Sequence, residues 1–252
     1  MTGRAAHCAS ILLLTEDSGK NGFAVVEALS KRLMRLVDPS CRTHRIDFEP
    51  AKDDARRLVN GNAWKGKRAD RVRLQQTIAT KVAEDGPPGF VFFHVDGDCA
   101  WSERKRARNP RALDACITEG VRAILGRHMH RHAPLDAEAI AARMTRLIVL
   151  VPHYSIEAWL YQNIAVAMRL CRRHHGGRHI EQFRTWEQNR SDIDELCNPK
   201  DVVCLSDKHN LELATEAYPA GAAVQAGTSF AHAADALRAC EALCAALGAS
   251  RS

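Results

Sequence analysis

The sequence predicts an α/β fold: a parallel β-sheet flanked by helices, with a helical extension at the C-terminal end. Short apolar runs of strand length alternate with helical periodicity over roughly the first two-thirds of the 252 residues. Acidic side chains directly follow two of these runs, and the last third is mostly helical in pattern. Alternating strands and helices are typical of a parallel sheet covered on both faces. We therefore expect an α/β core over residues 1–175 and a helical extension packed on it over residues 176–252.

The first strand and helix form one α/β step. Residues 11–15, Ile-Leu-Leu-Leu-Thr, predict a buried strand because turn-forming residues follow and end the run. From Phe23 onward apolar residues follow helical spacing until Pro39 closes the segment. A short strand is expected next, over residues 43–48.

The same alternation continues through the middle of the chain. A Gly-Pro-Pro-Gly turn over residues 86–89 precedes the run 90–95, Phe-Val-Phe-Phe-His-Val, which we expect to be the central strand. The other expected elements here are helices over 74–82 and 113–125 and, after a short Ala-rich segment over 136–144, a strand over 147–151.

The C-terminal part is predicted to be helical. Ser155 is expected to cap a single long helix that ends at Gly176-Gly177. Polar residues 189–200 predict a connector, and residues 230–247 predict one amphipathic closing helix.

Composition places the chain among folded globular proteins. Hydrophobic residues make up 46% of it and charged residues 26%. No apolar run is long enough to span a bilayer and no signal-peptide pattern is present, so we expect a cytoplasmic protein without a membrane partner. The nine cysteines are odd in number and never form Cys-x-x-Cys, which favours reduced thiols.

Three acidic residues are the candidates for chemistry. Glu16 follows the first strand, and Asp96 and Asp98 follow the expected central strand. The carboxyl ends of parallel strands share one edge of the sheet, so these carboxylates can converge although eighty residues separate them. Asp-Gly-Asp alone most often marks a turn, and an acidic residue after a strand often caps a helix. Their coincidence after two strands favours a Mg²⁺ or Mn²⁺ site, because crowded carboxylates require a cation.

Other residues are weaker candidates. Glu157 lies in the first turn of a helix after a buried strand. It is expected either to interact favourably with the helix dipole or to ligate a second metal. Lys208 is either a solvated lysine or a cation that holds a scissile phosphate. His94 is expected to be a core histidine. The spacing of His128, His130 and His132 does not favour a zinc cluster.

The charge distribution favours a polyanionic partner. The formal net charge is +6, and a basic run, Arg104-Lys-Arg-Ala-Arg108-Asn-Pro-Arg111, begins shortly after Asp98. Such a run is commonly a solvated face, but its position beside the expected metal site favours nucleic acid. The candidate nucleic-acid contacts are Lys20, Arg104, Lys105, Arg106 and Arg108.

The segments around the acidic residues resemble a known family. Leu-Leu-Leu-Thr-Glu16-Asp and Val-Phe-Phe-His-Val-Asp96-Gly-Asp98 resemble the two signatures of the TOPRIM domain of primases, topoisomerases and OLD-type nucleases. The segment Val-Pro-His-Tyr-Ser-Ile-Glu157-Ala-Trp-Leu is similar to a helix start in small stand-alone TOPRIM proteins of bacterial defence and mobile loci. The resemblance covers roughly the first two-thirds of the chain. Thr15 precedes Glu16 where the family commonly has a small residue, and no primase or topoisomerase companion domain is present.

This resemblance implies a Rossmann-like TOPRIM sheet in which Glu16 does acid/base or metal work and Asp96 and Asp98 bind Mg²⁺. It implies a Mg²⁺-dependent nuclease that hydrolyses DNA, with RNA as the other substrate, in anti-phage or anti-plasmid defence. One alternative is a regulatory or toxin subunit that is active only with a partner ATPase or another defence-system subunit. A second is a phosphotransferase or phosphatase for small molecules, which no Gly-rich phosphate loop supports. Strandedness, endo- or exonucleolytic cleavage and homo-oligomerisation stay open.

Overall fold

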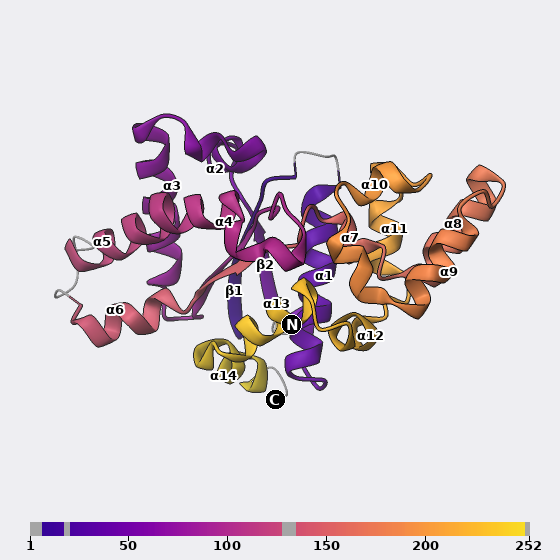
Figure 1. Cartoon of the computed structure of the whole chain (residues 1–252). Coiled ribbons are helices and arrows are strands. Elements are labelled where there is room, and N and C mark those ends of the chain that lie inside the picture. Colours follow the sequence, from indigo (N-terminus) through magenta and orange to yellow (C-terminus); the bar gives the residue numbers. More distant parts are fainter. Residues whose placement is uncertain (1–6, 18–20, 128–134, 250–252) are drawn as a thin grey trace.

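Four parallel strands form the centre of the molecule, in the order β2-β1-β3-β4 (Figure 1). The computed structural model describes residues 7–17, 21–127 and 135–249. The strands are β1 (Ala9–Thr15), β2 (Ile46–Pro50), β3 (Gly89–His94) and β4 (Leu147–Leu150). The predicted α/β class, with a parallel sheet flanked by helices and a helical C-terminal region, is confirmed.

Alternating side chains of the central strands build two separate hydrophobic cores. Ile11 and Leu13 of β1 belong to one core, together with Phe90 and Phe92 of β3. Their neighbours point to the other face and belong to the second core, which includes Leu12, Leu14, Val91 and Phe93. All eight side chains are buried, as expected where helices cover both faces of a parallel sheet.

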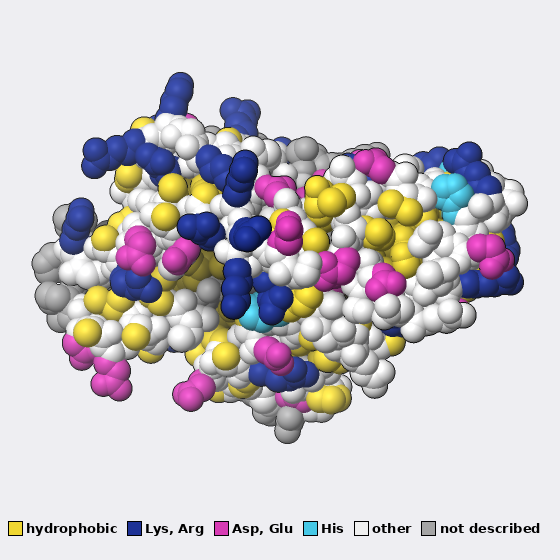
Figure 2. Space-filling view, in the orientation of Figure 1, with side chains coloured by type: hydrophobic (Ala, Val, Ile, Leu, Met, Phe, Trp, Pro, Cys, Tyr) yellow, Lys and Arg dark blue, Asp and Glu magenta, His cyan; other side chains and the backbone are white. Residues whose placement is uncertain are grey.

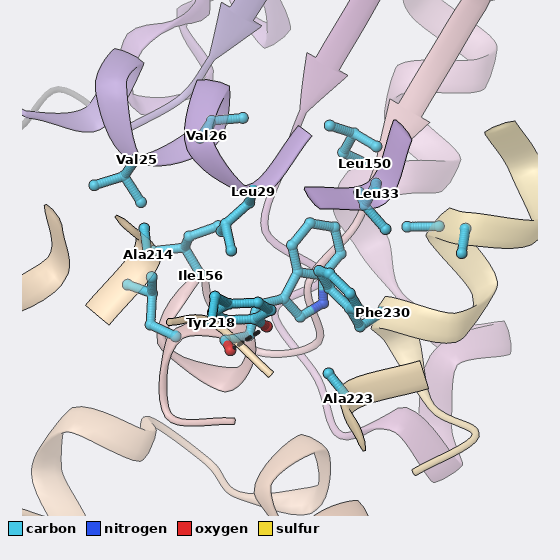
Figure 3. Packing of buried hydrophobic residues seen from close by; sticks show 14 of the residues in the cluster. Val25, Val26, Leu29, Leu33, Leu150, Ile156, Ala214, Tyr218, Ala223 and Phe230 are labelled. Atoms are coloured by element: carbon cyan, nitrogen blue, oxygen red, sulfur yellow. Dashed lines mark hydrogen bonds between the residues drawn. The ribbon is translucent and has the colours of Figure 1, made fainter. Parts of the chain in front are cut away.

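The first core lies between the sheet and helices from both ends of the chain. Its helices include α1 (Gly22–Val37), α11 (Asn210–Thr215), α13 (Ser229–Arg238) and α14 (Glu241–Ala249). Figure 3 shows Leu29 and Leu33 of α1 pointing toward Tyr218 and Phe230. The Tyr218 hydroxyl donates a hydrogen bond of 2.7 Å to the carbonyl of Trp159. C-terminal helices are therefore part of the packing that holds β1 and β3.

The second core lies under helices on the opposite side of the sheet (Figure 1). These are α2 (Asp53–Val59), α3 (Arg68–Val82), α4 (Arg108–Leu113), α5 (Glu119–Arg127) and α6 (Ala137–Met144). A π-helical turn, Asp114–Thr118, joins α4 to α5, so the predicted helix 113–125 is continuous but not uniformly α-helical. Trp64, in the 3-10 turn Asn60–Lys65, packs edge-on against Phe93 and closes this core near the end of β3.

Two helices that were predicted as single are broken. Between α7 (Glu157–Leu160) and α8 (Ile164–His175), the Asn163 amide donates to the carbonyls of Leu213 and Glu216, at 2.9 and 2.7 Å. These tertiary hydrogen bonds hold Asn163 outside the helix. Ser155 does not cap α7, whereas Gly176, with φ of +61°, ends α8 as predicted. The closing segment is likewise divided, into α13 and α14.

The polar segment 189–200 contains a buried acidic residue. It forms the 3-10 turn Arg190–Glu195 before α10 (Pro199–Val202), and α9 (Ile180–Gln188) and α12 (Ala220–Gln225) complete the helices. Asp194 is fully buried and accepts hydrogen bonds from the hydroxyls of Thr228 and Ser229 at the start of α13. Ser229 in turn accepts a bond of 2.6 Å from the Trp159 indole. The connector is thus tied into the first core.

Two further expectations bear on the described residues. No described helix is both long and apolar enough to cross a membrane. The cysteines, all of which lie in the described ranges, are free thiols.

Leu29→Ala is expected to lower the free energy of unfolding by about 2–5 kcal/mol, because Leu29 is fully buried between the sheet and the C-terminal helices. Urea unfolding measures this change. The exposed Val72→Ala on α3 is the control and should change stability by less than about 0.5 kcal/mol. Equal effects of the two substitutions would contradict the packing described.

Candidate metal centre and basic surface

Glu16 and Asp96 meet where the two central strands end. Thr15 pairs with His94 in the β1–β3 register, so the residues that follow lie side by side. The Asp96 amide donates a 2.6 Å hydrogen bond to Glu16 Oε1, and the Glu16 amide donates to the His94 carbonyl at 3.3 Å. The pairing of two buried strands therefore fixes the contact between these acidic residues.

His94 lies beneath this contact and is fully buried. Its Nδ1 is 2.9 Å from Thr15 Oγ1, and its Nε2 is 3.5 Å from Asp96 Oδ1. Burial alone would lower the pKa of His94, but the Asp96 carboxylate, followed by Glu16 and Asp17, raises it above the usual value. His94 is thus a buried histidine that contacts an acidic site residue, which its apolar strand context alone did not indicate.

The pKa values of Glu16, after β1, and Asp98, after β3, are also perturbed. Burial, followed by the charge of Asp96, raises the pKa of Glu16 from 4.5 to about 7. Burial and Asp96 raise the pKa of Asp98 as well. Asp96 is therefore the common neighbour through which the three acidic residues interact. Both shifts show that the site resists full ionisation when no cation is bound.

The loop after β4 holds the Asp96-Gly97-Asp98 turn in place. The Gly97 amide donates to the Pro152 carbonyl at 2.9 Å, and the Asp98 amide donates to the Tyr154 carbonyl at 3.4 Å. A Cβ on residue 97 would lie 3.1 Å from His153 Nδ1, so a side chain there would crowd the histidine. Asp98 itself has a φ of +55°, a left-handed conformation that Asp tolerates better than most residues. This spacing of acidic residues depends on a small residue between them.

Asn109 and Lys65 belong to the same site, although the sequence analysis did not select them. The buried Asn109 amide donates to the Asp96 carbonyl at 2.9 Å and to Asp98 Oδ2. Lys65 donates to Asn109 Oδ1, and its charge opposes the rise in the pKa of Asp98. The only sequence signal for Lys65 is its place in the basic run Lys-Gly-Lys-Arg over residues 65–68, which does not reveal its partner.

The donor set fits a hard divalent cation. Glu16 Oε2 and Asp96 Oδ1 are buried and form no hydrogen bond with a described residue, although His94 Nε2 lies 3.5 Å from Asp96 Oδ1. Buried carboxylate oxygens without partners are unfavourable unless a cation or water binds them. No group of three or more His, Cys, Asp or Glu side chains within the described ranges is arranged to hold a metal. Mg²⁺ commonly binds one or two carboxylates and several waters, and Glu16 and Asp96 match that number of protein ligands.

The interactions of the two remaining candidates lie elsewhere. Glu157 is buried at the start of α7, where it accepts hydrogen bonds from Ser155 and Asn210 at 2.6 and 3.3 Å. Lys208 is exposed in the turn Asp207–His209. Burial, followed by the charges of Arg178 and Lys208, lowers the pKa of His175, and burial followed by Lys208 lowers the pKa of His209. Among the described residues, neither forms a hydrogen bond or ion pair with Glu16, Asp96 or Asp98.

The positive charge is concentrated beside the candidate site. Residues 52–73 carry eight Lys or Arg against three Asp, and residues 101–111 carry five against one Glu, whereas the whole chain has a net charge of +6. The rest of the chain is therefore net acidic. We call the exposed Arg56, Arg57, Lys65, Lys67, Arg68, Arg104, Lys105, Arg106 and Arg108 the basic surface. The hydrogen bond from Lys65 to Asn109 connects the two basic segments, 52–73 and 101–111. Figure 2 shows Lys and Arg side chains gathered over α2, α3 and α4.

Some predicted residues lie outside the described ranges. These are Lys20, which was expected to contact nucleic acid, and His128, His130 and His132.

The raised pKa of Glu16 predicts a pH-dependent stability. The folded state keeps a proton on Glu16 between pH 4.5 and about 7 that the unfolded state has lost. The free energy of unfolding of the metal-free protein should therefore fall across this window, relative to Glu16→Gln, and change no further above it. Urea unfolding at a series of pH values measures the difference between the two proteins. Parallel pH profiles would show that Glu16 is not perturbed.

Comparison with known proteins does not assign the chain to a family. No protein-family model, no curated protein and no solved structure matches the chain.

Proposed function

We propose that the protein is a Mg²⁺- or Mn²⁺-dependent nuclease of TOPRIM type that hydrolyses phosphodiester bonds of DNA or RNA. The observation that carries the proposal is the contact between Glu16 and Asp96, in which each carboxylate presents a buried oxygen without a hydrogen-bond partner among the described residues. Carboxylates that emerge from adjacent parallel strands are placed where α/β proteins bind ligands. The basic surface beside them supports a polyanionic substrate rather than a small neutral one.

The chain's own residues have separate roles in this proposal. A bound Mg²⁺ would polarise the scissile phosphate and lower the pKa of a water ligand. Glu16 and Asp96 would hold the ion, and the Glu16 carboxylate at the same edge of the sheet would accept a proton from the attacking water. Asn109 positions Asp96 and Asp98 through its side-chain amide, and Lys65 provides positive charge where the substrate phosphate would approach.

A biological role in anti-phage or anti-plasmid defence rests on the resemblance of three sequence segments to stand-alone TOPRIM proteins. One observation favours the alternative, a subunit that cuts only with a partner such as an ATPase. The described residues contain no preformed group of three metal-binding side chains, so partner binding could complete the site. Glu157 and Lys208 are not assigned roles here, because their interactions are with residues outside the Glu16–Asp96 contact.

Cleavage of supercoiled plasmid, single-stranded DNA and RNA tests this proposal. We expect cleavage in Mg²⁺ or Mn²⁺ and none in chelator. Glu16→Gln and Asp96→Asn should each lower the rate by about 100-fold or more, because each removes a metal ligand or proton acceptor.

Glu187→Gln is the matched control, since Glu187 is an exposed glutamate on α9. It should cut at the wild-type rate. Metal-dependent cleavage that survives in both site variants would place the active site elsewhere. A wild-type chain that binds metal but cuts none of the three substrates would favour the partner-dependent alternative.

A further inference from the structure

A group of aromatic and basic side chains lies next to the turn at residues 96–98. Trp101 comes three residues after this turn. Its ring centroid lies 5.0 Å from that of His153 and 5.8 Å from that of His232. The guanidinium carbon of Arg104 lies 4.3 Å from the Trp101 ring centroid, which is a close cation–π contact. We call these four residues the Trp101 cluster.

The Trp101 cluster is connected directly to the candidate metal centre. His153 packs edge-on with Trp101 on one side and approaches the backbone of Gly97 on the other. Its Nδ1 also lies 3.2 Å from the carbonyl of Cys99, between the turn and Trp101. One imidazole ring therefore separates the Trp101 ring from the acidic turn.

The segment that carries Trp101 is held in place. The Ser102 amide and hydroxyl donate to the Glu195 carboxylate at 3.0 and 2.6 Å, which fastens the turn Trp101–Arg106 to the turn Arg190–Glu195. Arg104 Nη1 donates to the Trp101 carbonyl at 3.0 Å, so the guanidinium is fixed above the ring. A surface that is ordered before binding loses less entropy when a ligand arrives.

Exposure distinguishes Trp101 from the other tryptophans. Trp64, Trp159 and Trp186 are at most 1% exposed and belong to the hydrophobic cores. Trp101 is partly exposed, and Arg104 above it is exposed. An indole with a guanidinium stacked on it offers a flat cationic surface, and nucleobases stack on both kinds of group.

We propose that the Trp101 cluster binds an unpaired nucleobase, so that the substrate is a single-stranded or locally unpaired nucleic acid. This inference rests on the proposed function, because it assigns the strand state of the nucleic acid at the same site. Bases inside a duplex are stacked on one another and cannot reach this surface. In this arrangement the basic surface contacts the phosphates of the strand, and the Trp101 cluster selects strands whose bases are unpaired.

Binding in chelator, where no cleavage occurs, tests the inference. The probes are fluorescently labelled oligothymidylate, oligouridylate and an abasic sugar-phosphate oligomer of equal length. The wild-type protein should bind both base-containing strands more tightly than the abasic one. Trp101→Leu should weaken binding to them by roughly tenfold and leave binding to the abasic strand unchanged, whereas Trp101→Phe should retain most of the affinity.

Wild-type tryptophan fluorescence gives a second measurement that needs no variant. Oligothymidylate should quench the emission of the partly exposed Trp101, and the abasic strand should not. Equal affinity for strands with and without bases, together with unchanged fluorescence, would overturn the inference. If bases stack on Trp101 but the protein cuts no substrate, the proposed nuclease activity is refuted and the inference about the unpaired base stands. If cleavage depends on Glu16 but not on Trp101, the inference about the unpaired base is refuted and the nuclease activity stands.

Discussion

The in-register pairing of β1 with β3 is the constraint on which the candidate site depends. Because Thr15 pairs with His94, the next acidic residues of both strands are brought together at one edge of the sheet. Burial, followed by repulsion from the Asp96 carboxylate, raises the pKa of Glu16. Without a metal, the pair therefore keeps a proton to a higher pH than an isolated glutamate does. A divalent cation would replace that proton, which links the fold of the sheet to the proposed chemistry.

The surroundings of this contact hold it from several directions. His94 lies below it, and Asn109 of α4 donates hydrogen bonds to the turn after β3. Backbone carbonyls of the loop after β4 accept hydrogen bonds from the amides of the same turn. The C-terminal helices pack behind β1 and β3 in the first core, so residues far along the chain support the strands that position Glu16 and Asp96. The turn is connected to the basic surface through Asn109 and Lys65, and to the Trp101 cluster through His153.

Much of the fold could be predicted from the sequence, because buried parallel strands are short apolar runs that can be recognised without knowledge of tertiary contacts. Residues 11–15 and 90–95 are examples. Helix breaks were missed where tertiary hydrogen bonds decide the backbone, as at Asn163. In the site, Glu16, Asp96 and Asp98 were selected because each follows a strand. Lys65 and Asn109 were not, because their roles arise from contact between segments about forty residues apart. The buried Asp194 was hidden for the same reason, in a segment that is polar overall.

Mn²⁺ binding, followed by electron paramagnetic resonance, tests most directly whether the contact between Glu16 and Asp96 is a cation site. The account predicts that the wild-type protein binds Mn²⁺, that Mg²⁺ displaces it, and that Glu16→Gln and Asp96→Asn each weaken binding by at least about tenfold. The exposed Glu187→Gln should bind as the wild type does. Absence of binding, or equal binding by the wild type and both site variants, would contradict the account.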